Sequence, residues 1–133
     1  MSAPEDLVRA AEAARANAYA PYSRFAVGAA LRDAGGAVHA GCNVENVSYP
    51  EGCCAETAAI AAMVSAGARA IAEICVAGPP GHAISPCGGC RQRLSEFAGP
   101  STPVHMSDGL GGWHSMTLGE LLPAAFGLGK RDR

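Results

Sequence analysis

The sequence has few aromatic residues, little net charge and no long uninterrupted hydrophobic run. Aromatic side chains make up 5% of the residues, too few for a stacking platform that binds extended single-stranded nucleic acid. The formal net charge of −2 argues against a partner with a phosphate backbone. Proline and glycine break the apolar stretches before they reach the roughly 18–20 residues of a membrane span. These shortages favour a small-molecule partner over a nucleic acid or a membrane.

Composition and length indicate one folded domain. Hydrophobic residues make up 49% and charged residues 17%, which excludes an intrinsically disordered chain. A chain of 133 residues buries enough surface to fold without disulfide bonds, so we expect a single domain over residues 1–133. Charged side chains within residues 2–18 exclude a signal-type apolar run there, and the expected location is the cytoplasm. Because thiols stay reduced in that compartment, the six cysteines favour metal binding or catalysis over disulfides.

Hydrophobic periodicity predicts helices and strands that alternate along the chain. Ser2 and Glu5 match a capping box at the start of a helix over residues 2–18. Further helices are expected over residues 54–66, 87–97 and 118–126 (the last as a helix or an ordered tail), and strands over residues 25–31, 38–44, 71–77 and 104–107. This order predicts an α/β fold of three layers, α/β/α, built on a mixed sheet of about five strands.

Two cysteines near the third predicted helix have the spacing of a metal site. Cys87 and Cys90 form a C-x-x-C motif, which allows two thiolates to bind one tetrahedral ion. In the first turn of a helix this spacing puts both side chains on one face, where exposed backbone amides also stabilise thiolates. The motif is equally compatible with a redox pair, so these two residues alone leave both interpretations open.

Cys54 and Glu56 complete a catalytic pattern at the start of the preceding helix. Cys54 supplies a third thiolate, and three protein ligands leave one zinc position open, as in catalytic sites. Two residues apart within a helix, the side chains of Cys54 and Glu56 would point roughly 200° away from each other. We therefore expect Cys54 at the non-helical N-cap, from which both groups face one pocket. A carboxylate beside a zinc-bound water is suited to proton transfer.

These motifs resemble those of a known enzyme family. The sequence C-A-E at residues 54–56 and P-C-G-G-C-R-Q at residues 86–92 are similar to the signature of the cytidine deaminases of nucleoside salvage, in their small three-cysteine form. The resemblance continues over residues 22–31, 41–46, 48–50 and 121–126. It implies the cytidine deaminase fold, a homotetramer, and hydrolysis of cytidine and deoxycytidine to uridine and deoxyuridine with release of ammonia. A small nucleoside of pyrimidine salvage is then the partner.

The resemblance implies the catalytic roles as well. One zinc ion per subunit would bind Cys54, Cys87 and Cys90, with water or hydroxide as the fourth ligand. Glu56 would take the proton of that water, protonate the pyrimidine N3 as hydroxide attacks C4, and later deliver a proton to the leaving amine.

Further residues match positions that contact the substrate in the family, namely Phe25, Asn43, Glu45, Tyr49, Ala55 and Phe126. Asn43 and Glu45 are similar to the pair that hydrogen-bonds the ribose. Phe25 resembles a ring packed near the base, while the backbone of Ala55 and the loop residue Tyr49 would help to line the pocket. Phe126 matches an aromatic residue that reaches the site of a neighbouring subunit in the homotetramer.

The position after the glutamate departs from the family pattern. Three thiolates give a bound Zn²⁺ site a formal charge of −1, which lowers the acidity of the metal. The family often offsets this charge with an arginine directly after the catalytic glutamate, where this chain has Thr57. We expect Arg91 and the helix amides to compensate for the charge, together with a hydrogen bond from the Thr57 hydroxyl to a thiolate.

Simpler interpretations stay open for these residues. A structural zinc site would use the adjacent Cys53 as its fourth ligand, and Glu56 would then only complement the helix dipole. The residues matched to the ribose and the base can be ordinary polar and core residues, and Phe126 can be part of a packed tail. The four histidines show no ligand spacing.

Three other functions compete with cytidine deamination. A related deaminase can act on another small nucleoside such as blasticidin S. A deaminase of RNA or DNA would need a basic surface and usually has histidine at the position of Cys54. A non-catalytic binding module stabilised by zinc would have no open coordination position and no dependence on Glu56.

Overall fold

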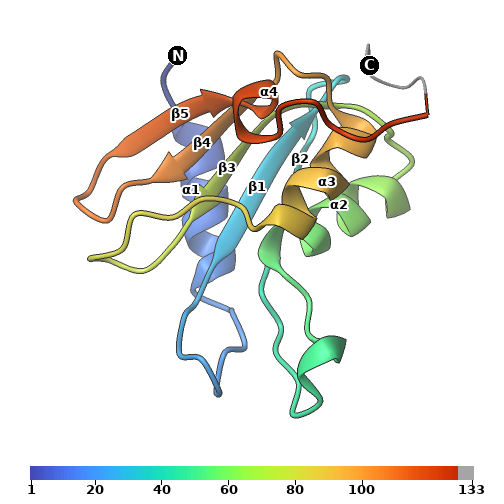
Figure 1. Cartoon of the computed structure of the whole chain (residues 1–133). Helices are drawn as coiled ribbons and strands as arrows, with labels where there is room; N and C mark the ends of the chain where they lie inside the picture. The colour runs from blue at the N-terminus through green and yellow to red at the C-terminus, as the bar shows by residue number, and fades with distance from the viewer. Residues whose placement is uncertain (129–133) are drawn as a thin grey trace.

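A mixed five-stranded sheet runs through the middle of the structure, a computed structural model that describes residues 1–128 (Figure 1). The strand order is β2-β1-β3-β4-β5, and β3 and β4 are the parallel pair while the other neighbours are antiparallel. The strands are β1 (Gly28–Asp33), β2 (Val38–Cys42), β3 (Ile71–Ala77), β4 (Pro103–Ser107) and β5 (Trp113–Thr117). The expected mixed sheet of five strands is therefore confirmed, whereas the last five residues of the expected 1–133 domain lie outside the described residues.

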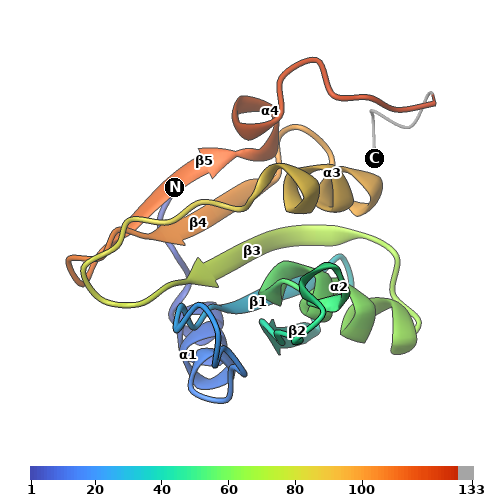
Figure 2. The same ribbon diagram turned by 60° about the horizontal axis from the view of Figure 1, so that its bottom comes forward.

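Helices cover both faces of the sheet, which gives the expected three layers (Figures 1 and 2). The helices are α1 (Glu5–Arg15), α2 (Ala55–Ser65), α3 (Gly88–Phe97) and the short α4 (Leu118–Leu121), with a 3₁₀ turn η1 (Tyr49–Glu51). One core contains α1 and the other contains α2 and α3. None of these helices within residues 1–128 has the length and apolar character needed to cross a lipid bilayer.

Alternation along the strands divides the core between the two faces. Ile74 and Val76 on β3 pack in the core of α2 and α3, while the intervening Cys75 packs in the core of α1. Glycine allows α2 to approach β2 closely, because a Cβ at Gly41 would lie 2.6 Å from the backbone nitrogen of Ala59. This close contact sets where the N-terminus of α2 lies.

The first helix differs from its sequence-based prediction. It begins at Glu5 rather than at Ser2, and its N-cap is Pro4, with no capping hydrogen bond from a side chain. Pro4 has extended backbone angles, so Ser2 lies outside the helix and cannot form the expected capping box with Glu5. The helix also ends at Arg15, before the predicted residue 18.

Three further elements, β1, α4 and β5, also differ from the sequence-based prediction. The first strand begins at Gly28 instead of residue 25, and the last helix ends at Leu121 instead of residue 126. The prediction named no strand over Trp113–Thr117, which forms β5 and pairs with β4. A capping box does occur at α4, where Thr117 and Glu120 hydrogen-bond each other's backbone amides.

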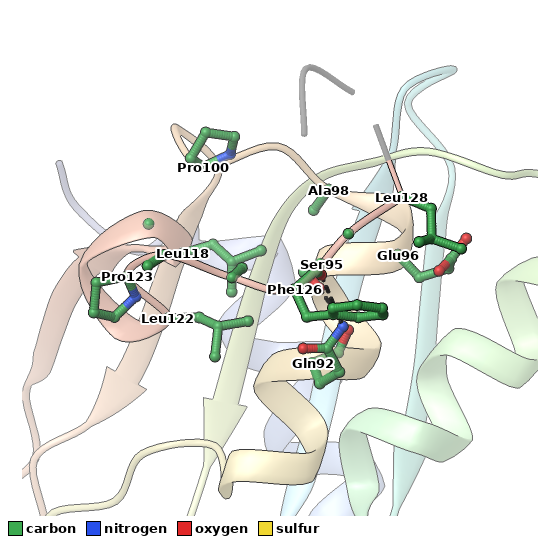
Figure 3. Close-up of a pocket in the computed structure, with 14 residues that line it drawn as sticks. Gln92, Ser95, Glu96, Ala98, Pro100, Leu118, Leu122, Pro123, Phe126 and Leu128 are labelled. Atoms are coloured by element: carbon green, nitrogen blue, oxygen red, sulfur yellow. Dashed lines mark hydrogen bonds between the residues drawn. The ribbon is translucent and has the colours of Figure 1, made fainter. Parts of the chain in front are cut away.

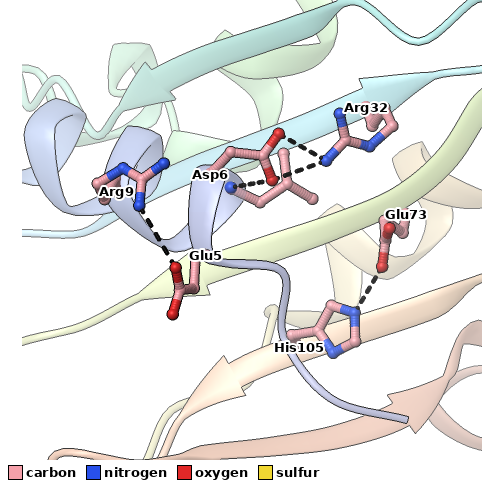
Figure 4. Close-up of polar contacts among 7 residues, drawn as sticks. Glu5, Asp6, Arg9, Arg32, Glu73 and His105 are labelled. Atoms are coloured by element: carbon pink, nitrogen blue, oxygen red, sulfur yellow. Dashed lines mark hydrogen bonds and ion pairs between the residues drawn. The ribbon is translucent and has the colours of Figure 1, made fainter.

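Charged and polar contacts tie the face of α1 to the sheet (Figure 4). The Nη2 atom of Arg32 on β1 donates to both carboxylate oxygens of Asp6 on α1, each at 2.8 Å. Nearby, the ring of the buried His105 on β4 contacts Glu73 on β3 at 2.8 Å and Ser115 on β5 at 2.7 Å. The His105 contacts hold β3, β4 and β5 together, and the Asp6–Arg32 contact ties α1 to β1.

The Asp6–Arg32 contact should make folding depend on pH, and Asp6→Asn should weaken that dependence. The hydrogen bond from Arg32 lowers the pKa of Asp6 below its usual value of 3.8. The contact therefore stabilises the fold above pH 3.8 and is lost as the pH falls through the lower pKa of the folded state. Urea unfolding between pH 6 and pH 2 gives the free energy of unfolding at each pH. As the pH falls, this free energy should decrease less steeply for Asp6→Asn and for Arg32→Gln than for wild type. Identical pH profiles in all three proteins would contradict this assignment.

Candidate metal centre and active site

Three cysteines from two helices meet at one point of the structure. The Sγ atoms of Cys54, Cys87 and Cys90 all lie within 4.8 Å of one another, and no other such group of three or more His, Cys, Asp or Glu residues occurs in residues 1–128. Cys54 is the N-cap of α2 and Cys87 is the N-cap of α3, both with extended backbone angles. Cys90 lies in the first turn of α3 and is buried. The expected placement of Cys54 at a non-helical cap is therefore confirmed.

The chemistry of this donor set fits a zinc ion. Burial raises the pKa values of the Cys54 and Cys90 thiols, and the negative charge of nearby Glu56 raises them further. Burial acts on Cys87 in the same direction, but hydrogen bonds from the Cys90 backbone and from the side chains of Cys90 and Cys54 outweigh it, so the pKa of Cys87 is instead lowered. Placing thiolate charge on all three clustered sulfurs at once is therefore unfavourable unless a cation is bound between them. Thiolates are preferred ligands of zinc, and the N-termini of both helices add positive potential at the same point.

Glu56 lies beside the cysteines, in the first turn of α2. Its side chain is buried, with 4% of the residue exposed. Burial raises the pKa of the carboxyl group, while its backbone hydrogen bond, Cys90 and the charge of Arg93 partly oppose that rise. A carboxyl group whose pKa is raised toward neutrality is suited to accept and return protons.

A cavity of about 360 Å³ opens over these groups. Its lining includes Cys54, Cys87, Glu56, Ala55, Phe25 and Asn43. The Asn43 amide fixes one wall, because its Oδ1 accepts from the Val27 amide at 2.9 Å and its Nδ2 donates to the Phe25 carbonyl at 2.8 Å. The structure thus brings three of the predicted substrate residues to the same cavity as the cysteines and the glutamate.

Comparison with known proteins assigns the chain to a family. A family model described as the cytidine and deoxycytidylate deaminase zinc-binding region matches residues 1–106. The chain belongs to this deaminase family. It is 41% identical to a cytidine deaminase of Sporosarcina psychrophila over 122 residues, which cover 92% of this chain and 90% of the relative. A cytidine deaminase of Mycobacterium tuberculosis is 48% identical over 116 residues, 86% of this chain and 83% of the relative.

The fold agrees with solved structures of cytidine deaminases. A crystal structure of the Burkholderia pseudomallei cytidine deaminase superposes with a TM-score of 0.87 at 44% identity, covering 93% of this chain and 99% of the other. The Mycobacterium tuberculosis structure gives a TM-score of 0.81 at 43% identity and covers 92% and 96% of the two chains. The sequence-based assignment to the family and to its fold is therefore confirmed.

Two residues that the family resemblance placed at the substrate line a neighbouring hollow. Glu45 and Tyr49 border a separate cavity of about 250 Å³. The carboxylate of Glu45 accepts hydrogen bonds from the backbone amides of Tyr22 and Ser23 and from the Ser23 hydroxyl. The hydroxyl bond lowers the pKa of Glu45, so its carboxylate stays charged. Tyr49 is 74% exposed, and its assigned role stays a prediction.

Phe126 lies farther away, in a third cavity of about 380 Å³ between α3 and the C-terminal segment (Figure 3). Phe126 is 73% exposed, and its carbonyl accepts a hydrogen bond from Gln92 on α3 at 3.3 Å. Phe126 does not line the cavity of the cysteines within its own chain. The role that the deaminase family suggests for it requires a second subunit.

The hydrogen bonds of Arg91 go to the loop before α3 and to the end of α4. Its guanidinium donates to the Pro86 carbonyl at 2.7 Å, the Leu121 carbonyl at 2.8 Å and the Ser85 hydroxyl at 3.1 Å, all of them neutral oxygens. Arg91 follows Cys90 by one position on α3, and adjacent helical residues point in different directions. Arg91 therefore fixes the loop before α3, and its expected compensation of charge at the zinc site stays a prediction.

Sequence reasoning missed two residues near the site. Arg93 contacts the sulfur of Cys90, and its spacing of three residues from Cys90 on a helix was a usable signal. His82 packs edge-on against Phe25, with ring centroids 5.3 Å apart, and nothing in its sequence context indicated this contact. The expected contact of Thr57 is present, because its Oγ1 lies 4.0 Å from Cys90 Sγ.

Proposed function

We propose that this chain is a zinc-dependent cytidine deaminase that converts cytidine and deoxycytidine to uridine and deoxyuridine with release of ammonia, in pyrimidine salvage. The observation that carries the proposal is the meeting of three cysteine sulfurs beside buried Glu56 at a cavity. Family membership supports the same reaction class.

The residues of the cluster would divide the chemistry as follows. Cys54, Cys87 and Cys90 would hold one zinc ion per chain. Zinc bound there supplies a Lewis acid that makes water acidic near neutral pH. Glu56 takes one proton from water and donates it to the pyrimidine N3 as the water oxygen bonds to C4. It then takes the second proton from that oxygen and passes it to the amino group, which leaves as ammonia as the C4–N4 bond breaks and the C4 carbonyl forms. Ala55 lies between Cys54 and Glu56 in the sequence, and its backbone would line the cavity where the base would lie.

The nucleoside would extend from this cavity toward the neighbouring hollow. Asn43 uses one acceptor site and one donor site on the backbone, which leaves a further lone pair and hydrogen for a sugar hydroxyl. Glu45 stays charged and offers an acceptor to a second hydroxyl. Phe25 would pack near the base, Tyr49 would cover the pocket, and Phe126 would come from another subunit of a homotetramer.

The same proposal covers the setting in which the enzyme works. We place it in the cytoplasm as a single domain over residues 1–133, which agrees with six cysteines that are all free thiols. The alternative substrate is another small nucleoside such as blasticidin S, because the metal cluster and Glu56 would serve either one.

The test is ammonia release from zinc-loaded protein given cytidine, deoxycytidine, blasticidin S or free cytosine. We expect both pyrimidine nucleosides to be turned over and cytosine to react poorly, because cytosine lacks the hydroxyls that Asn43 and Glu45 would bind. Turnover of blasticidin S alone would reject the substrate assignment and retain the reaction class. Absence of turnover of all four, with one zinc bound per chain, would contradict the proposed function.

A further inference from the structure

One arginine contacts the cysteine cluster directly. Within residues 1–128, the arginine with a hydrogen bond to one of the three sulfurs is Arg93, whose Nη1 lies 3.9 Å from Cys90 Sγ. Three thiolates and Zn²⁺ carry a net negative charge, so a cation at this sulfur has an electrostatic reason to be there.

The helix geometry of α3 favours this contact. Arg93 follows Cys90 by three positions, and residues at this spacing share a helix face. Gly89 gives the guanidinium room, because a Cβ at that position would lie 3.1 Å from Nη1 of Arg93. Cys90 therefore receives a donor from its own helix along a face that carries no side chain at residue 89.

A second donor reaches the same sulfur from the other helix. The hydroxyl of Thr57 on α2 lies 4.0 Å from Cys90 Sγ. Cys90 is the most deeply buried of the three cysteines, so its thiolate has the least access to water. Arg93 and Thr57 thus supply protein donors where solvent cannot.

We propose that Arg93, assisted by Thr57, offsets the negative charge of the metal-binding thiolates and thereby sets the metal affinity of the site. The inference rests on the proposed zinc site. A donor at the sulfur reduces the repulsion between thiolates and draws electron density from Cys90, so a bound metal keeps more of its acidity. Arg93 is a positioning and charge-compensating residue, since it acts through Cys90 and not on the substrate.

The test measures metal binding rather than turnover. Zinc affinity is determined by competition with a chromophoric chelator, and Co²⁺ loaded in place of zinc reports on the sulfurs through its charge-transfer absorption. Arg93→Gln should weaken zinc binding by about 10-fold and shift the Co²⁺ charge-transfer band to longer wavelength, because the sulfur becomes more electron-rich. Arg93→Lys should restore most of the affinity.

Two further variants and a control separate charge at the sulfur from other effects. Adding Thr57→Arg to Arg93→Gln should restore affinity, because residue 57 lies at the same sulfur. Gly89→Ala should act like a weaker Arg93→Gln, since the added Cβ crowds the guanidinium. Arg9→Gln is the matched control, as it removes an equally charged side chain that pairs with exposed Glu5 on α1.

The possible results distinguish a failure of the Arg93 inference from a failure of the proposed zinc site. Wild-type affinity and an unshifted Co²⁺ spectrum in both Arg93→Gln and Gly89→Ala would overturn the inference. An equal loss of affinity in Arg9→Gln would overturn it too, because the effect would then be one of net charge. Failure of the wild-type chain to bind one zinc would instead overturn the proposed metal site.

Discussion

Glu56→Gln is expected to reduce the turnover of cytidine by about 10²- to 10⁴-fold while zinc stays bound. Glutamine has the size and hydrogen-bonding atoms of the native side chain and cannot carry a proton between water and the pyrimidine. The side chain is buried in the first turn of α2, next to the cysteines, so the substitution removes the acid without opening the site to solvent. Steady-state assays by the ultraviolet change of cytidine, with zinc content measured on the same samples, provide the readout.

Glu12→Gln is a suitable control for this experiment. Glu12 lies on α1, on the opposite face of the sheet, where it pairs with Arg15 at 3.4 Å. It should retain the turnover of wild type. If Glu56→Gln were as active as Glu12→Gln, proton transfer by Glu56 would be rejected, and the interpretation of Glu56 as a residue that merely complements the helix dipole would stand.

Cys54→Ala is expected to lose both zinc and activity, whereas Cys53→Ala should keep both. Four-ligand sites bind zinc with roughly 10–16 kcal/mol, so one missing thiolate corresponds to about 3 kcal/mol, or on the order of 100-fold in affinity. Cys54 has its sulfur in the cluster, while the adjacent Cys53 contributes no sulfur to it and points its thiol at the Cys54 carbonyl, 3.5 Å away. The two variants are matched, because each removes one sulfur atom and their positions are adjacent in the sequence.

Zinc per chain and the chelator-competition affinity would be measured for both variants. Loss of zinc in Cys53→Ala would indicate a fourth protein ligand and a structural site with no open position. Retention of zinc in Cys54→Ala, with affinity unchanged, would exclude Cys54 as a ligand. Circular dichroism of each variant distinguishes loss of the metal from loss of the fold.

The helical caps of the site were predictable because local chemistry determines them. The two-residue separation of Cys54 and Glu56 is incompatible with a shared helix face, and this alone required Cys54 to be the N-cap, as found. The C-x-x-C motif likewise predicted the first turn of α3. The sequence therefore predicted the meeting of the three sulfurs, although which residues contact the substrate stays a prediction.

The failures came where distant parts of the chain decide the structure. The strand β5 was missed because Ser115 is polar and its partner, buried His105, lies on another strand. The hydrogen bonds from Arg91 to the Pro86 and Leu121 carbonyls were likewise not predictable from its place next to Cys90. Periodicity predicts which face a side chain occupies, whereas its partner depends on the tertiary fold.

The bonds of Arg91 also bear on where this chain can tolerate change. One guanidinium connects the loop that leads into Cys87 with the carbonyl of Leu121 at the end of α4. Chain termini are usually the most permissive positions for trimming or fusion, but only where their backbone makes no bonds inward. Here a deletion that reaches Leu121 would leave a donor of Arg91 without its acceptor and loosen the loop that carries a cysteine of the cluster. Because the Phe126 carbonyl also accepts a hydrogen bond from Gln92 on α3, the permissive part of the C-terminus should begin only after Phe126.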